Sequence, residues 1–259
     1  MNIILGSQSP RRRELMAGLD IPFTCVTIDA DESYPADLQA GDIPLYISRA
    51  KARAYASELR ENDLLITSDT IVWLNGVMLG KPQDEADAKA MLSRLSGQTH
   101  EVYTAVCFAD KNGELETFVD CTKVTFKTLS EEEIDYYVTK YRPLDKAGAY
   151  GVQEWIGYVG VTKMEGSYFN VMGHVTEHAV STWLITHLSR DYSCTDHVAL
   201  MQWVPKCGSP TSSISISWKL LEMQILRSYS RATEPRSLGG AQLPVFSKVL
   251  QMILTRAKA

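Results

Sequence analysis

The residues best suited to chemistry near the start of the chain are two serines, a proline and three consecutive arginines, in residues 7–13. They follow a short apolar run, residues 3–5, that is typical of a buried strand. Proline suits the first turn of a helix, whose free N–H groups attract anions. Three permanently charged guanidinium forks add donors for phosphate oxygens. The pattern predicts an anion site between strand and helix, and an ordinary capped helix with a solvated basic turn fits the same residues.

A carboxylate follows a later apolar run. Asp69 comes after residues 64–66, where we expect a buried strand to end. Catalytic groups commonly lie at the carboxyl ends of strands in open α/β sheets. A carboxylate there can hold a divalent cation or accept a proton from water. The alternative is a turn aspartate that caps the hairpin after it.

A predicted hairpin returns a lysine toward Asp69. Asn75-Gly76 is a strong signal for a tight turn between residues 71–74 and 77–79. The return strand leads to Lys81, so we expect the lysine beside the carboxylate. Two such charges form either a surface pair of little energetic value or a charged clamp on phosphates.

Two other charged residues are less distinctive by themselves. Lys51 lies among alanines on a predicted long helix, where most lysines are solvated. Glu32 ends an acidic loop whose default interpretation is an exposed turn. Its hard oxygen ligands also suit Mg²⁺ or Mn²⁺, which commonly bridge substrate phosphates.

A stretch rich in small residues, 145–153, is the last candidate. Small residues let the backbone approach a ligand closely. Gln153 has both a donor and an acceptor and could contact the edge of a nucleobase. A glycine-rich turn fits equally well. His100 precedes an apolar strand without an evident partner, and we interpret it as structural.

The elements that must position these residues alternate between strand and helix over the first two thirds of the chain. Their pattern predicts a mixed α/β sheet with helices on its faces. We expect strands at 3–5, 23–28 and 64–66, helices at 10–18, 43–59 (with Asp42 as N-cap and Leu45, Ala52 and Ala56 facing inward) and 84–95, a long hairpin of 102–108 and 118–126, a helix opened by the capping box Ser130-Glu131-Glu132-Glu133, and a turn-rich, strand-like region from 148 to about 163.

The composition narrows the function class. The 259 residues carry a net charge of −5, which disfavours non-specific binding of duplex nucleic acid. Five widely spaced cysteines without a CxxC pair argue against a disulfide framework and a zinc site. The sequence shows neither a signal peptide nor a run of membrane-spanning length. We therefore expect a cytoplasmic protein that binds neither nucleic acid nor membrane.

The character of the chain changes after Gly173. Residues 174–259 hold 9 Lys and Arg against 5 Asp and Glu, so this part is basic in an acidic protein. Its charge lacks the interleaved aromatics typical of single-strand binders. We predict one domain over 1–173 and an atypical appendage over 174–259, with a closing helix at 176–188 followed by poorly ordered chain.

Taken together, these segments resemble the Maf family of nucleoside triphosphate pyrophosphatases. The resemblance implies an elongated α/β fold akin to inosine triphosphate pyrophosphatases, with a mixed twisted sheet, flanking helices and two lobes around a cleft. It covers residues 1–173, and the matching residues are Ser7-Gln8-Ser9-Pro10-Arg11-Arg12, Glu32, Lys51-Ala52, Ser68-Asp69-Thr70-Ile71-Val72, Gly80-Lys81-Pro82, Leu95-Ser96-Gly97, Asp145 through Gln153 and Val171-Met172-Gly173.

The resemblance also implies an activity and roles for the residues. The activity is hydrolysis of dTTP and UTP, and of modified pyrimidine nucleotides, between the α and β phosphates, with Mg²⁺ or Mn²⁺, by a homodimer. Asp69 matches the proton acceptor, and Glu32 with Asp69 would hold the metal. The phosphate-binding positions match Ser7, Arg11, Arg12, Lys51 and Lys81, and the branch that prefers dTTP and UTP over 7-methyl-GTP has the residues that match Arg12, Thr70 and Gln153.

Other interpretations of the same residues stay open. One is a nucleotide-sensing regulator of septum formation without turnover. Another is a pyrophosphatase for 7-methyl-GTP or a damaged purine triphosphate. The chain also departs from the family pattern, because His174-Val175 stands where a Leu-Pro and a closing helix usually follow. A shifted reading frame beyond codon 173 is one hypothesis for this departure.

Overall fold

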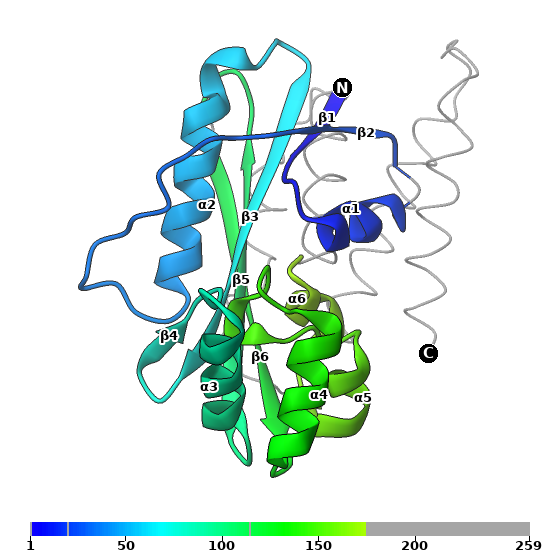
Figure 1. Cartoon of the computed structure of the whole chain (residues 1–259). Helices are drawn as coiled ribbons and strands as arrows, with labels where there is room; N and C mark the ends of the chain where they lie inside the picture. The colour runs from blue at the N-terminus through cyan, green and yellow to red at the C-terminus, as the bar shows by residue number, and fades with distance from the viewer. Residues whose placement is uncertain (1, 20, 114, 175–259) are drawn as a thin grey trace, which may run out of the picture. The chain divides into compact units, whose positions relative to one another are not determined.

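The computed structural model describes residues 2–19, 21–113 and 115–174 (Figure 1). The chain divides into two units, Met1–His187 and Leu188–Ala259, and every described residue belongs to the first. The predicted closing helix and, apart from His174, the appendage lie outside the described residues, and the domain boundary at 173 stays a prediction. None of the described helices is long and apolar enough to cross a membrane.

One mixed sheet organises the described residues. Its strand order is β2-β1-β3-β5-β6-β7, and a short seventh strand, β4, pairs with β3. The first three strands are parallel, whereas β5, β6, β7 and β4 each run antiparallel to their partners. The strands are β1 (Asn2–Gly6), β2 (Phe23–Val26), β3 (Asp63–Leu74), β4 (Val77–Leu79), β5 (Thr99–Ala109), β6 (Leu115–Phe126) and β7 (Val161–Glu165).

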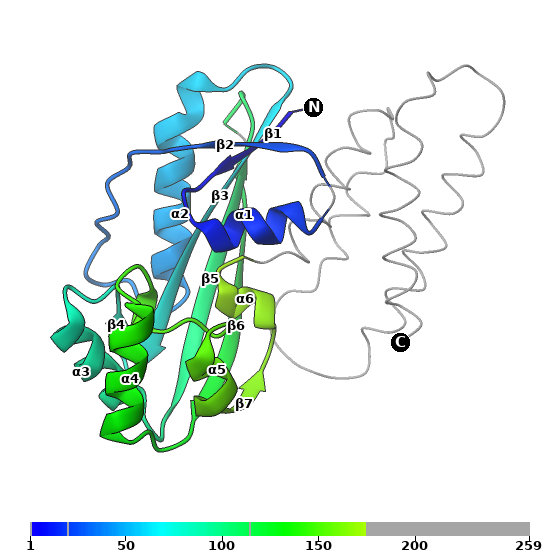
Figure 2. The same cartoon turned by 45° about the vertical axis from the view of Figure 1, so that its right-hand side comes forward.

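The helices gather at two levels along the long strands, as Figures 1 and 2 show. At the level of β1 and β2 lie α1 (Pro10–Ala17) and α2 (Asp42–Tyr55). The helix α2 packs against β3 and β5 and continues into η1 (Ala56–Glu58). At the other end lie α3 (Glu85–Leu95), α4 (Glu131–Tyr141), η2 (Ala147–Ala149) and α5 (Trp155–Gly160), and α6 (Tyr168–Met172) lies between the levels. The predicted mixed α/β sheet with flanking helices is confirmed.

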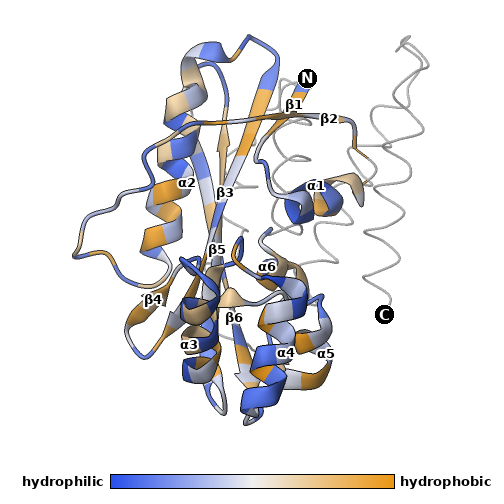
Figure 3. Cartoon of the chain, in the orientation of Figure 1, coloured by the Kyte–Doolittle hydropathy of each residue, from blue (hydrophilic) through white to orange (hydrophobic). Residues whose placement is uncertain are grey.

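Each level has its own apolar core. A large cluster joins α3, α4 and α5 to the end of β3, the start of β5 and the end of β6. Its buried members include Leu92, Phe126 and Tyr137. Separate clusters pack α1 and α2 against β1, the first half of β3 and the end of β5. In Figure 3 the apolar start of β3 gives way to hydrophilic residues near its middle. That polar stretch lies where the two levels meet.

The structure corrects the expectation that a strand ends before Asp69. β3 is one continuous strand from Asp63 to Leu74, so Asp69 lies in its middle. Residues 68–70 stay extended because each is paired with β5, in the register Ser68↔Val106, Asp69↔Ala105 and Thr70↔Thr104. The predicted strands 64–66 and 71–74 are two parts of the same strand, because cross-strand pairing overrides the local polarity of the segment between them.

Several other predictions are confirmed with small shifts. The Asn75-Gly76 turn joins β3 to β4, the long hairpin forms β5 and β6, and Ser130 with Glu133 makes the capping box of α4. Asp84 caps α3, and Gly18 ends α1. The second strand stops at Val26 because its pairing with β1 ends there.

Two predicted elements need correction, and the first is the long helix. It starts at Asp42, with Gly41 as its N-cap, and becomes a 3₁₀ turn after Tyr55. Its fully buried face is built on Ile43, Ile47 and Ala52, whereas Leu45 and Ala56 are only half-buried.

The second is the region from 148 to 163, expected to be strand-like. It contains the helix α5, and β7 begins only at Val161. The glycine at 157 allows this helix, because a Cβ there would clash with the carbonyl oxygen of Val152. The periodicity of so short a helix is weak, so the glycines dominated the sequence pattern.

His100 is a structural residue, as expected, and it has a partner that the sequence did not reveal. It is 1% exposed, and its Nε2 lies 2.7 Å from the hydroxyl oxygen of Tyr150. Burial lowers the pKa of His100 to about 4, so the imidazole is neutral at neutral pH.

Candidate active site

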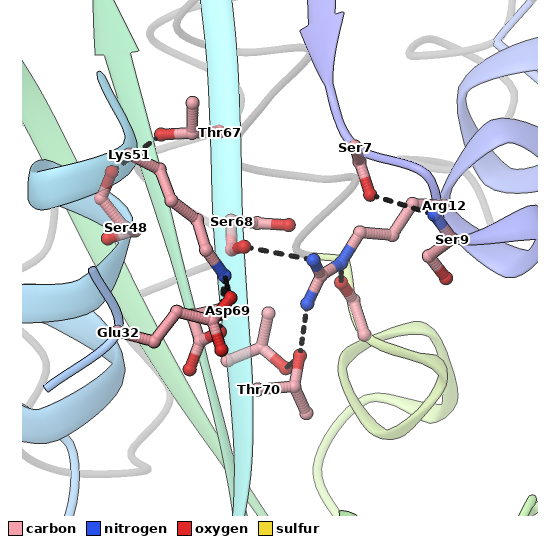
Figure 4. Close-up of polar contacts among 12 residues, drawn as sticks. Ser7, Ser9, Arg12, Glu32, Ser48, Lys51, Thr67, Ser68, Asp69 and Thr70 are labelled. Carbon is pink, nitrogen blue, oxygen red and sulfur yellow. Dashed lines mark hydrogen bonds and ion pairs between the residues drawn. The ribbon is translucent and has the colours of Figure 1, made fainter. Parts of the chain in front are cut away.

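Lys51 joins the two acidic residues that the sequence singled out. Its ammonium lies 2.9 Å from Oε1 of Glu32 and 2.8 Å from Oδ1 of Asp69 (Figure 4). The three residues come from α2, from the loop after β2 and from the middle of β3. The side chains of Lys51 and Asp69 are only 13% and 14% exposed, whereas that of Glu32 is 56% exposed. The cluster is therefore anchored inside and open on the side of Glu32.

The charges around Glu32 keep it ionised. Burial raises the pKa of Glu32, but the hydrogen bond and charge of Lys51, together with the charges of Lys81 and Arg12, bring it below the ordinary value. Lys81 is exposed just beyond the return strand of the hairpin. The hairpin thus carries Lys81 to the neighbourhood of this cluster, while the lysine in contact with Asp69 is Lys51.

Arg12 of α1 forms a second polar group on β3. Its guanidinium donates to the carbonyl oxygen of Gly173 at 2.8 Å, to that of Ser68 at 2.9 Å and to Oγ1 of Thr70 at 3.1 Å. Burial lowers the pKa of Arg12, and the negative charges of Asp69 and Glu32 oppose that shift. Arg12 therefore ties α1, β3 and the end of α6 together. Among the described residues these bonds use three of its five N–H donors.

The two groups lie on opposite faces of β3, because Asp69 and Thr70 are consecutive residues of a strand. Figure 4 shows Lys51, Glu32 and Asp69 on one side of the strand and Arg12 on the other. Pairing of β3 with β1 ends at Thr67, and pairing with β4 begins at Val72. Between them, residues 68–71 pair only with β5 among the described strands. The two groups therefore flank one edge of β3 that has no partner among the described strands, and the charges of Arg12 and Glu32 act on each other's pKa.

The start of α1 lies at this edge, and its free backbone N–H groups are not paired with an acidic side chain of the first turn. Pro10 occupies the first turn, as predicted, and the first turn contains no acidic residue. Ser7 is buried, and its Oγ accepts from the backbone N–H of Ser9 at 3.2 Å. Figure 4 shows Ser7, Ser9 and Arg12 on the same side of β3. The helix dipole and Arg12 thus add positive potential here.

The loop 145–154 is held by its own buried network. Lys146 is 8% exposed and pairs with Asp145 at 2.7 Å and Glu154 at 3.1 Å. The hydroxyl of Tyr137 donates to Glu154 and accepts from the N–H of Gly151. This network fixes the backbone on both sides of Gln153.

Within that loop, Oε1 of Gln153 is buried and has no hydrogen-bond partner among the described residues. Burial of an amide oxygen without a hydrogen bond costs free energy, and such an oxygen suits a position where a ligand supplies the missing hydrogen bond. Burial raises the pKa of Asp145, and the charges of Lys146 and Arg11 lower it below the ordinary value. Arg11 therefore lies close enough for its charge to act on this loop.

The structure also shows polar residues that the sequence did not single out. Thr104 of β5 contacts Thr70, and Asn170 of α6 contacts Thr104. The one available signal was a threonine inside an apolar strand, which is too common to indicate a site. Gly148, one of the small residues of this stretch, packs against Val72 of β3.

The donor set suits a hard divalent cation that is shared with a ligand. Glu32 and Asp69 offer carboxylate oxygens that both contact one cationic nitrogen, that of Lys51. The described part of the chain contains no group of three or more His, Cys, Asp or Glu that could hold an ion alone. Mg²⁺ commonly binds through one or two carboxylates plus phosphates, so two carboxylates at an open cluster fit it.

Comparison with known proteins gives consistent matches. A family model described as "Maf-like protein" matches residues 2–182. A Bacteroides thetaiotaomicron protein named "dTTP/UTP pyrophosphatase" is 56% identical over 172 residues, which cover 66% of this chain and 89% of that protein. A Flavobacterium psychrophilum protein of the same name is 50% identical over 185 residues, covering 71% and 94%. The solved Ham1 protein of Staphylococcus aureus matches with a TM-score of 0.39 at 16% identity, covering 61% of this chain and 91% of that one.

Proposed function

The chain belongs to the family of Maf-like proteins, and from this membership we propose that it hydrolyses dTTP and UTP between the α and β phosphates. The products are the nucleoside monophosphate and pyrophosphate. The names of its relatives at 50–56% identity support this substrate class. The observation that carries the proposal is the contact of Lys51 with both Glu32 and Asp69, beside the stretch of β3 that pairs only with β5 among the described strands.

In this proposal Asp69 accepts the proton of the attacking water. Its side chain is mostly buried and held by Lys51, so its carboxylate is oriented before substrate arrives. Lys51 has three N–H donors and uses two of them on carboxylates. The third remains for a phosphate oxygen, which places the charge of the lysine beside the reacting group.

Glu32 and Asp69 would hold the divalent cation, Mg²⁺ or Mn²⁺. When bound, the cation neutralises charge on the phosphates as the bond to the leaving pyrophosphate breaks. Ser7, Arg11 and Lys81 contribute further donors and positive charge around the same edge. Their separate positions in the chain suit a triphosphate, which is long and carries up to about four negative charges.

Arg12, Thr70 and Gln153 are proposed to contact the base. Within the described residues, Arg12 keeps two N–H donors for a ligand, and Gln153 keeps a buried, unpaired oxygen. Fixed donors and acceptors reject a base with the wrong pattern because the groups of the site are then left unpaired. We also propose that the protein acts in the cytoplasm as a homodimer, with residues 1–173 forming the catalytic domain.

The test is release of pyrophosphate by the full-length protein from UTP, dTTP, CTP, 7-methyl-GTP and dITP, with Mg²⁺ or Mn²⁺. We expect UTP and dTTP to give the highest kcat/KM. Binding of UTP without turnover would instead favour a nucleotide sensor. A preference for a purine triphosphate would overturn the proposed base selectivity while leaving the reaction type intact.

A further inference from the structure

The hydroxyl of Thr70 has two hydrogen-bonding neighbours, the guanidinium of Arg12 and the hydroxyl of Thr104. Arg12 Nη2 donates to its oxygen at 3.1 Å, and Oγ1 of Thr104 lies 3.0 Å away. The two threonines are directly opposite each other on neighbouring strands, in the register Thr70↔Thr104. A guanidinium can only donate, so Thr70 must accept from Arg12. Which threonine donates to the other depends on the surroundings of Thr104.

Those surroundings decide the direction. Oγ1 of Thr104 lies 2.8 Å from the carbonyl oxygen of Asn170. A carbonyl has no proton, so the single proton of Thr104 must lie in that contact. Thr104 therefore has no proton for Thr70. The proton of Thr70 points to Thr104, and the chain of donors runs from Thr70 through Thr104 to Asn170.

The last acceptor in this series of hydrogen bonds, the carbonyl oxygen of Asn170, is held in place by further contacts. Asn170 is 0% exposed, and its Nδ2 donates to the carbonyl oxygen of Val102 at 3.0 Å and to Oγ1 of Thr122 at 2.9 Å. Thr104 is also fully buried. The acceptor carbonyl is thus fixed relative to β5 and β6, so the direction of the hydrogen bonds cannot reverse without breaking this network.

The consequence concerns what Thr70 can offer to a ligand. A hydroxyl has one proton and two lone pairs. Thr104 takes the proton, and Arg12 occupies one lone pair. Among the described residues no other partner contacts Thr70, so one lone pair remains. Thr70 can therefore accept a hydrogen bond from a ligand but cannot donate one.

We propose that Thr104 is a specificity-determining positioning residue, which keeps Thr70 an acceptor and so favours a base that presents a donor there. This inference rests on the proposed function, in which Thr70 contacts the base. Uracil and thymine both carry a proton on N3, whereas the N3 of cytosine is an acceptor. The remaining lone pair of Thr70 would therefore accept a hydrogen bond from N3 of the base in both UTP and dTTP, whereas N3 of cytosine offers no proton.

The experiment compares three variants by the ratio of kcat/KM for UTP to kcat/KM for CTP. Thr104→Val keeps the shape of the side chain and removes its hydroxyl, and Thr104→Ser keeps the hydroxyl. Thr122→Val is the matched control, because Thr122 is equally buried and bonds Asn170 and Ser167 in the same network. The carbonyl of Asn170 still accepts from the N–H of Gly173 in Thr104→Val, which favours folding.

Freed from Thr104, the hydroxyl of Thr70 can turn and donate to cytosine N3. We expect the UTP to CTP ratio to fall about tenfold in Thr104→Val, the effect of roughly one hydrogen bond. Thr104→Ser and Thr122→Val should keep the wild-type ratio. Melting temperatures of all variants separate this effect from a loss of stability, and Thr104→Ala replaces Thr104→Val if the latter does not fold.

Two outcomes would overturn the inference. One is an unchanged ratio in Thr104→Val, or in Thr104→Ala, while UTP is still hydrolysed. The other is an equal fall in Thr122→Val, which would indicate general loosening of the network. A wild-type protein that hydrolyses neither UTP nor dTTP is a different result, because it contradicts the proposed function itself and this assignment with it.

Discussion

The ammonium of Lys51 lies 2.8 Å from Oδ1 of Asp69, and this contact ties α2 to the middle of β3. The same nitrogen contacts Glu32 at 2.9 Å. The ammonium of Lys51 thus contacts two carboxylates that are 37 residues apart in sequence. Both carboxylates lie beside the stretch of β3 that, among the described strands, lacks a partner on one side. The catalytic proposal depends on this arrangement, and the following variants test its parts.

Removing the charge of Asp69 should remove the proton acceptor. We expect Asp69→Asn to lower kcat for UTP by about 10²- to 10⁴-fold, the usual contribution of a general base, while nucleotide binding stays detectable. Pyrophosphate release gives kcat, and calorimetry gives binding. Asp135→Asn is the control, because Asp135 forms an exposed pair with Lys89. Undiminished turnover in Asp69→Asn would exclude the carboxylate from the mechanism.

The metal requirement should depend on Glu32. Glu32→Gln keeps the side-chain shape and removes one anionic ligand, so we expect the Mg²⁺ or Mn²⁺ concentration for half-maximal activity to rise by about tenfold or more. The measurement is a metal titration of activity after treatment with a chelator. Glu61→Gln alters a surface pair with Lys111 and should leave the titration unchanged. The same midpoint for Glu32→Gln and wild type would argue that Glu32 is not a ligand.

Arg12 should be irreplaceable by lysine, because its fork satisfies three acceptors at once. A lysine cannot reach all three from one position, and each buried acceptor left unpaired costs about 1–3 kcal/mol. We expect Arg12→Lys to lower the free energy of unfolding by about 2–4 kcal/mol in denaturant titrations. Arg13→Lys should change it by less than about 0.5 kcal/mol, since exposed Arg13 donates to the carbonyl of Gln8 at the surface. Equal effects of the two substitutions would contradict the clamp.

Gly148 should tolerate alanine less well than another glycine of similar backbone conformation. Its φ is +68°, and a Cβ there would lie 2.9 Å from Cγ2 of Val72. Gly76 has a φ of +81°, and a Cβ there would meet no atom of the described residues within 4 Å. We expect Gly76→Ala to cost about 1–2 kcal/mol from the backbone alone, and Gly148→Ala about 1–3 kcal/mol more from the clash. Thermal or denaturant unfolding measures both, and equal costs would show that Val72 moves away freely.

The buried His100 should make stability fall in mild acid. Burial lowers the pKa of His100 in the folded state to about 4, from an ordinary 6.5. Between these two pH values the unfolded state binds a proton that the folded state does not bind. The free energy of unfolding therefore decreases as the pH falls from about 6.5 to about 4, by about 3 kcal/mol from this residue.

The matching variant isolates that contribution. In His100→Gln the residue no longer titrates, so the difference in unfolding free energy between wild type and variant should shrink between pH 7 and pH 4. The pKa of His174 is also lowered by burial, to about 3, but His174 is present in both proteins and cancels in the difference. Parallel pH profiles would mean that folding leaves the pKa of His100 unchanged.

Local patterns of residues were enough to place most elements and to identify the candidate groups. Alternation and apolar runs marked the strands, Asn75-Gly76 marked the hairpin, and Ser130 with Glu133 marked the start of α4. These signals succeed because turns, caps and strand faces depend on residues a few positions apart. They failed for α5, whose six residues are too few to show a helical period.

Which of these groups meet follows only from long-range packing. Lys51 is one lysine among alanines until α2 packs beside β3, and Thr104 is one threonine in an apolar strand until it faces Thr70. The contact of Arg12 with Gly173 spans 161 positions of the chain. Such contacts follow from the register of strands and the packing of helices across the whole domain, and no local pattern of residue types specifies either.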